Sequence, residues 1–267
     1  MKSIQFLSSS QTFKMFSLKA RNIFDTFEPL QKVSQPFGLT SFSIKINKGT
    51  YKTFNSIGNV FFITVFSVWS LYCAFCYAMF LKDSPSEKKP FMSEIFQKTI
   101  SAVMLTFLTL STFLNWWIFS SQRVVCRALN LIQLVDEDFS KNGLSTNFGK
   151  QKTVLIIGIS ASFVVTTFGV MLANSDRNVF DIYDNWALVM FSFACCVEHW
   201  YLITLHFTFF MWIVMLRFET LNLYLNGILN ETEIKAEDNL KIRKASEIFE
   251  MLVEVCECFN QSYGIPV

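Results

Sequence analysis

The sequence feature that most constrains the fold is a largely apolar run of 30 residues, from Ala187 to Leu216. The run contains one acid and two histidines, and no Lys, Arg, Asp, Gly or Pro. A helix of this length spans roughly 45 Å, and the hydrocarbon core of a bilayer is about 30 Å thick. Because a helix on the surface of a soluble protein needs only one apolar face, a helix that is apolar all round predicts a membrane span.

Three earlier segments share this character, and the composition agrees with them. The chain is 52 % hydrophobic and contains 31 Phe, which is more apolar than an ordinary soluble domain. We therefore predict an all-α membrane protein with four transmembrane helices and long cytoplasmic helical extensions. The four predicted spans are residues 56–81, 94–119, 153–173 and 187–216.

Two polar regions are predicted to extend the helices beyond the membrane. The second span is expected to run on as a helix, because apolar residues recur at spacings of four, three and three after it. Residues 217–267 are expected to form an amphipathic helical segment that leads to a missing fifth span. Its apolar stripe comprises Ile248, Leu252, Val255 and Phe259. An acidic stripe beside it comprises Glu247, Glu250, Glu254 and Glu257.

The first 55 residues form a basic arm that precedes the four-helix bundle of residues 56–216. Within this arm, residues 27–39 contain Pro and Gly, which favour turns, and apolar residues alternate with polar ones after them. We expect a short helix followed by a turn, lying at the membrane surface.

The distribution of Lys and Arg predicts the orientation. The arm, the loop 120–152 and the tail contain eight, five and five of these residues, whereas the two short loops contain four and one. This bias predicts a multi-pass protein of the cell membrane with a cytoplasmic N-terminus. The sequons at Asn230 and Asn260 would then carry no glycan.

Two stretches resemble the insect gustatory receptor family, part of the seven-transmembrane insect chemoreceptor superfamily. They are Pro-Phe-Gly-Leu at 36–39 and Leu-Val-Glu-Val-Cys-Glu-Cys-Phe-Asn-Gln-Ser-Tyr-Gly at 252–264. The resemblance implies a taste receptor subunit that binds a small tastant and acts in a homo- or hetero-tetrameric, ligand-gated cation channel. It also implies that this chain is a partial or truncated N-terminal part, which lacks the last three helices of a seven-helix receptor and therefore the pore.

Two other roles remain open at this point. The chain could be a non-conducting four-span isoform or a membrane scaffold that associates with other subunits, or an unrelated four-span adaptor. The sequence contains no Gly-x-Ser-x-Gly, no His-Glu-x-x-His and no phosphate-binding Gly-rich loop. We therefore predict that it is not an enzyme, has no cofactor and binds no nucleic acid.

The candidate ligand-binding residues are Glu198, His199 and Tyr201 in the fourth predicted span. An ionisable group at that depth is costly unless it faces protein or water, which makes Glu198 a functional candidate. Alternatively, Glu198 pairs with a Ser, Thr or His of a neighbouring helix and only fixes the packing, or it carries a proton. His199 and His206 lie roughly 10 Å apart along one helix, so they cannot bind one metal ion or haem together, and no metal site is predicted.

Overall fold

The computed structural model of the chain describes residues 20–39, 42–47, 50–55, 57–83, 94–175, 186–229 and 236–263. The two predicted short loops begin at residues 82 and 174, which lie at the ends of helices, and the rest of each loop and the sequon at Asn230 lie outside the described residues. The elements in chain order are α2 (Ile23–Ser34), the 3₁₀-helix η1 (Gln35–Phe37), β1 (Phe42–Asn47), β2 (Thr50–Asn55), α3 (Ile57–Asp83), α4 (Glu94–Lys141), α5 (Phe148–Ser175), α7 (Trp186–Leu229) and α8 (Ala236–Tyr263).

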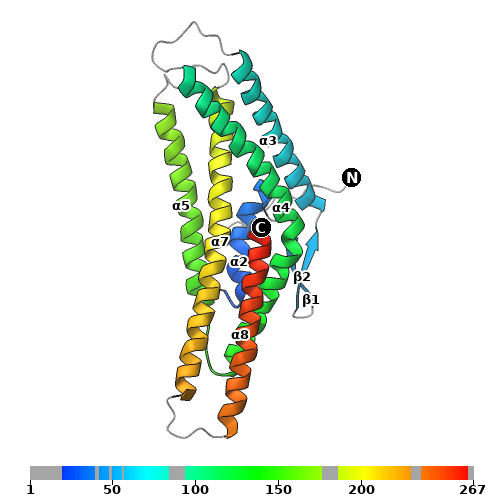
Figure 1. Ribbon diagram of the computed structural model, residues 1–267, viewed down its shortest axis with the longest axis vertical. Helices are drawn as coiled ribbons and strands as arrows, with labels where there is room; N and C mark the ends of the chain where they lie inside the picture. The colour runs from blue at the N-terminus through cyan, green and yellow to red at the C-terminus, as the bar shows by residue number, and fades with distance from the viewer. Residues whose placement is uncertain are drawn as a thin grey trace, which may run out of the picture.

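The helices run along the long axis of an elongated molecule (Figure 1). In the upper half of that view, α3 and α5 lie beside the adjoining parts of α4 and α7. In the lower half, α4 and α7 continue and pack against α8. The helices α4 and α7 therefore belong to both halves, and α2 lies between the halves near the middle.

The length of α4 and α7 confirms that the second predicted span continues as a helix. These helices have 48 and 44 residues, so each is more than about 65 Å long. That length is about twice the thickness of a hydrocarbon core. The four residues that predicted the extension, Val125, Leu129, Ile132 and Val135, are at most 3 % exposed.

The lower half is held together by the apolar stripes that the sequence predicts. The apolar stripe of α8, from Ile248 to Phe259, is buried against α4 and α7. This stripe takes part in two apolar clusters. One of them also contains Leu221 of α7 and Val135 and Phe139 of α4. Helical periodicity alone places these side chains on one face of each helix, which is why the burial of that face could be predicted from the sequence.

The segment before the first long helix is a helix and a turn, as predicted, but its position differs from the prediction. Asn22 caps α2 by accepting a hydrogen bond from the backbone N–H of Asp25, and Gly38 ends η1 in the left-handed region. The α2 side chains Ile23, Phe27 and Leu30 are at most 1 % exposed. They pack against α5, α4 and α7 within the molecule, so α2 is a core element rather than a surface helix.

A β-hairpin adds to the helical fold and was not predicted. The strands β1 and β2 pair antiparallel, from Phe42 opposite Asn55 to Asn47 opposite Thr50. Only two residues connect the strands, a length typical of tight hairpins. The all-helical prediction holds for the rest of the described chain.

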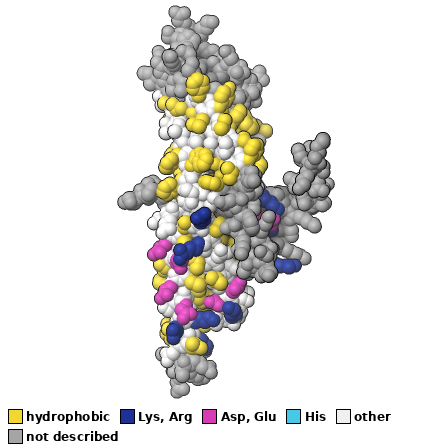
Figure 2. Space-filling model, turned by 90° about the vertical axis from the view of Figure 1, so that its right-hand side faces the viewer, with side chains coloured by type: hydrophobic (Ala, Val, Ile, Leu, Met, Phe, Trp, Pro, Cys, Tyr) yellow, Lys and Arg dark blue, Asp and Glu magenta, His cyan; other side chains and the backbone are white. Residues whose placement is uncertain are grey.

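Two helices are long and apolar enough to cross a membrane, judged by length and composition among the described residues. They are Phe148–Leu172 within α5 and Ala194–Leu229 within α7, and a shorter apolar stretch covers Val60–Phe75 of α3. Only 17 % of the most apolar window of α5 is buried, so its side chains face outward, unlike those of a soluble core helix. Figure 2 shows the same division on one face, with hydrophobic side chains in the upper half and charged ones in the lower half.

A buried ion pair joins α4 to α7 in the lower half. The Arg217 guanidinium donates from Nε and Nη2 to both carboxylate oxygens of Asp136, at 3.1 and 2.9 Å. Thr146, in the connection to α5, donates to the same carboxylate at 3.1 Å. Burial raises the pKa of the Asp136 carboxyl above its ordinary value, and the charge and hydrogen bonds of Arg217 and Thr146 oppose that rise. Both side chains are at most 4 % exposed, so each charge depends on the other.

We predict that Asp136→Ala lowers the free energy of unfolding by about 3–5 kcal/mol, because it leaves the Arg217 charge buried without its partner. Chemical denaturation of the protein in detergent measures this loss. The control is Lys141→Ala, which removes an exposed ion pair with Asp138 and should cost less than about 1 kcal/mol. Equal losses in the two variants would contradict the importance of the buried pair.

Candidate functional site

The upper half of the molecule contains a line of buried polar and sulfur-containing side chains, which we call the polar seam. Its members repeat every three or four residues on three helices, which places them on the inward face of each helix. None is more than 5 % exposed, and none is an acid, a Lys or an Arg. The polar seam comprises Ser67, Ser70 and Cys73 of α3, Ser111 and Asn115 of α4, and Ser192, Cys196 and His199 of α7.

Three polar contacts join the helices across the polar seam. Their α7 members lie at successive turns, about 4.5–6 Å apart along the helix axis. One contact connects α7 to α3, and two connect it to α4. They are Cys73 Sγ to Ser192 Oγ at 3.0 Å, Ser111 Oγ to Cys196 Sγ at 3.8 Å, and Asn115 Oδ1 to His199 Nε2 at 2.8 Å.

His199 is the largest polar side chain of the polar seam and is fully buried. Its ring stacks on Phe66 of α3, with centroids 5.0 Å apart and planes 15° apart. When Nε2 donates to the Asn115 oxygen, Nδ1 of the neutral ring is left as an acceptor. The ring is therefore held in place by two helices and keeps one nitrogen for another partner.

Five buried nitrogen and oxygen atoms in or beside the polar seam have no hydrogen-bond partner among the described residues. A buried polar group without a partner costs about 1–3 kcal/mol, and folded proteins satisfy nearly all such groups. These groups together suit a molecule that can both donate and accept hydrogen bonds. The five atoms are Ser67 Oγ, Trp69 Nε1, Ser70 Oγ, Asn115 Nδ2 and His199 Nδ1.

Glu198 points to a different helix from its neighbour His199, because consecutive residues differ by about 100° around a helix. Ser162 and Thr166 of α5 donate hydrogen bonds to its two carboxylate oxygens, at 2.8 and 2.7 Å. Glu198 is 3 % exposed, so these contacts are made in the interior. They are the Ser and Thr contacts that the packing interpretation expects, and they join α7 to α5.

Tyr201 is not brought together with the other two predicted residues. Its side chain is 41 % exposed on the outer side of α7, whereas the next residue, Leu202, is fully buried. The structure therefore divides the predicted trio among three directions: α5 for Glu198, α3 and α4 for His199, and the exterior for Tyr201. The role of the three residues in ligand binding stays a prediction.

The second histidine, His206, has its own surroundings. Its Nδ1 lies 2.7 Å from the Leu202 carbonyl oxygen, to which it donates, and its ring contacts the edge of Phe27 from α2. His206 therefore helps to fix α2 against α7, and it does not share a partner with His199.

The turn after η1 reaches the lower end of the polar seam. Gly38 has φ +74°, and a Cβ at this position would lie 3.1 Å from the Ile63 Cα and 3.5 Å from Asn115 Nδ2. Only glycine combines this backbone conformation with so close an approach. The Pro-Phe-Gly-Leu segment thus packs directly beneath the Asn115–His199 contact.

Most of the polar seam was not predicted from the sequence. Ser67, Ser70, Ser111 and Asn115 are uncharged residues within largely apolar segments, so none is unusual alone. The available signal was their spacing of three or four residues, which places small polar groups on one face of each helix.

Comparison with known proteins supplies the family. Residues 27–267 match the sequence model of the family described as 7tm chemosensory receptor. The match covers most of the chain and confirms the resemblance drawn from the sequence. This is not a family of enzymes. No curated protein sequence matches the chain.

We predict that Gly38→Ala destabilises the protein more than Gly143→Ala. Both glycines have φ near +75°, so each alanine costs about 1–2 kcal/mol in backbone strain. A Cβ at Gly143 meets no atom within 4 Å, whereas one at Gly38 presses on Ile63. Thermal unfolding in detergent compares the pair, and equal losses would contradict the close packing of the turn against α3.

Proposed function

This chain belongs to the 7tm chemosensory receptor family, and on that premise we propose that it is a gustatory receptor subunit. The family supports a chemoreceptor role in a lipid bilayer, with small molecules as ligands. In the proposed role, a tastant binds within the helical bundle as part of a seven-span subunit. A tetramer of the same or different subunits then opens a path for cations, as the resemblance to gustatory receptors implies.

The polar seam is the observation that carries this proposal. A buried line of hydroxyl, thiol, amide and imidazole groups runs through the half of the molecule whose outer surface is apolar. Its unpartnered atoms include donors, such as Asn115 Nδ2 and Trp69 Nε1, and an acceptor, His199 Nδ1. Because none of its members is an acid, Lys or Arg, we propose that the ligand is a neutral, hydrogen-bonding molecule.

The predicted site residues take different parts in this proposal. His199 contacts the ligand through Nδ1, since Asn115 and Phe66 hold the ring in one orientation. Glu198 positions α7 against α5 through Ser162 and Thr166. Tyr201 stays a prediction from the sequence, and its outward position makes it the comparison residue for a test.

The apolar outer faces support placing the upper half in the membrane. Large side chains of α3 and α5, such as Phe61, Phe75 and Val164, are more than 60 % exposed. A surface of this kind is stable in lipid and unfavourable in water. We propose that α3 and the first part of α4 also cross the bilayer, which gives four spans, and that the charged half faces the cytoplasm.

The ligand role is tested with the full-length receptor, expressed with its co-subunits and followed by evoked cation current. Fructose and myo-inositol serve as neutral probes and quinine as a cationic one. We expect His199→Ala to raise the half-maximal concentration of an active neutral probe about tenfold or more, which corresponds to about 1.4 kcal/mol. Tyr201→Phe should leave it unchanged, and Glu198→Gln should reduce the amount of folded receptor at the surface.

The control for this experiment is surface labelling, which separates lost binding from lost folding. A normal response in His199→Ala at normal surface expression would contradict the site. The absence of any ligand-evoked current from the full-length receptor would instead contradict the receptor function.

The proposed orientation gives a separate prediction. An epitope at the N-terminus should be stained only after the cells are permeabilised, and one inserted within residues 84–90 should be stained in intact cells, following the bias of Lys and Arg. Immunofluorescence measures both. A glycan at Asn230, or staining of the N-terminus in intact cells, would overturn the topology.

A further inference from the structure

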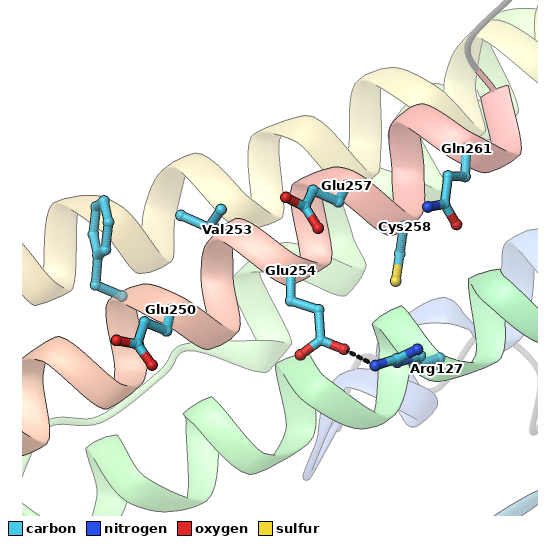
Figure 3. A pocket seen from close by; sticks show the side chains of 8 residues that line it. Arg127, Glu250, Val253, Glu254, Glu257, Cys258 and Gln261 are labelled. Atoms are coloured by element: carbon cyan, nitrogen blue, oxygen red, sulfur yellow. Dashed lines mark ion pairs between the residues drawn. The ribbon is translucent and has the colours of Figure 1, made fainter. Parts of the chain in front are cut away.

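A groove runs between α4 and α8 in the charged half of the molecule. Two hollows of about 450 and 540 Å³ share Glu250 and Glu254 on their walls, so they adjoin along α4 and α8. Figure 3 shows one of the hollows, where Glu254 of α8 reaches toward Arg127 of α4, and Glu250 and Glu257 project from α8 on either side of Glu254. We call the two hollows together the α4–α8 groove.

Acidic side chains outnumber basic ones along the α4–α8 groove. Six acids and two bases line it, which leaves an excess of four negative charges. The bases are already engaged, because Arg127 pairs with Glu254 and Lys141 pairs with Asp138. The acids are Glu137, Asp138, Glu247, Glu250, Glu254 and Glu257.

Three of these acids form no ion pair with any residue that the structure describes. Arg243 lies 3.7 Å from Glu247, and Lys244 lies 3.9 Å from Asp138. Glu137, Glu250 and Glu257 have no such cation, and all three are exposed, although Glu137 accepts a hydrogen bond from Gln133. Their charges are therefore available to a partner.

The α4–α8 groove also offers apolar surface beside these acids. Phe249 and Val253 of α8 are 51 % and 37 % exposed, and Leu134 of α4 is 50 % exposed. Phe249 and Val253 are four residues apart, so they lie on one face of α8 next to the acidic stripe. A segment that fits here needs apolar and cationic side chains side by side.

We propose that the α4–α8 groove binds a basic amphipathic helix of a protein partner. The acids of α8 recur at spacings of three, four and three from Glu247 to Glu257, which is the spacing of charged flanks along paired helices. An amphipathic helix laid in a groove is a recurrent mode of recognition. The partner contributes Lys or Arg at the same spacing and an apolar stripe over Phe249 and Val253.

The dimensions set the length of the bound helix. From Glu247 to Gln261, α8 advances about 21 Å, so a partner helix of roughly four turns covers the α4–α8 groove. The negative charge argues against a lipid headgroup or a nucleic acid as the occupant, since both present phosphates. This binding site is independent of the ligand site in the polar seam.

The test uses the full chain, purified in nanodiscs of zwitterionic lipid, and a labelled helical peptide of about 16 residues. The peptide carries Lys at spacings of three and four beside a Leu stripe, and a second peptide has Glu in place of each Lys. Fluorescence anisotropy measures the affinity. We expect the basic peptide to bind, to weaken as the salt concentration rises from about 50 to about 300 mM, and to bind more tightly than the acidic peptide.

A matched pair of variants localises the binding. Glu250→Gln combined with Glu257→Gln removes two charges of the α4–α8 groove, and should weaken the basic peptide about tenfold. Glu28→Gln combined with Glu219→Gln removes two charges elsewhere, on α2 and α7, and should change the affinity less than about twofold. Thermal unfolding confirms that both variants are folded.

Three results would overturn the proposal. They are no binding of the basic peptide to the unmodified protein, equal binding of the two peptides, and equal weakening in the two double variants. Val253→Ser provides a further check, because loss of the apolar contact should weaken the peptide even at high salt.

Discussion

The ion pair between Arg217 and Asp136 is the contact on which the arrangement of the two long helices depends. Its two charges are buried together, and an unpaired charge in that position would be strongly unfavourable. Arg217 also lies 18 residues, or five helical turns, after His199, so both residues face α4. The Asn115–His199 contact and the Asp136–Arg217 pair thus join the same two helices about 27 Å apart along α7. Two directional contacts at that separation fix how α7 is positioned along α4.

The packing of α4 against α7 connects the two halves of the molecule. In the upper half, α4 and α7 present the polar seam to α3, and in the lower half they present an apolar stripe to α8. Both helices are continuous between the two contacts. In the proposed receptor, a ligand that changes the position of the His199 side chain therefore acts on the same helix that bears Arg217, five turns further along. The core helix α2 packs against α5, α4 and α7 near the middle and restrains the same movement.

Local periodicity explains which parts of the fold could be predicted from the sequence. The long apolar segments and the apolar stripes of α4 and α8 are patterns within a single helix. Their burial could therefore be predicted without knowing which helix packs against them. The burial of α2 depends on α5 and α7, more than a hundred residues later, and the hairpin depends on pairing rather than on hydropathy. For the site, the contacts of Glu198 with Ser162 and Thr166 and of His199 with Asn115 join residues 32 to 84 positions apart. A single sequence could propose the two residues as candidates, but could not say which helix each one faces.

The charged half has an electrostatic asymmetry that bears on what binds there. In the proposed topology this half lies on the cytoplasmic side, where the inner leaflet is anionic and attracts Lys and Arg. The α4–α8 groove has the opposite charge, because Glu250 and Glu257 stand unpaired on its rim. The membrane surface therefore repels the groove and attracts the basic segments of the chain, and the two negatively charged surfaces compete for a basic partner. The same field raises the local concentration of cationic segments near the membrane, where a basic helix can pass from the lipid surface to the α4–α8 groove.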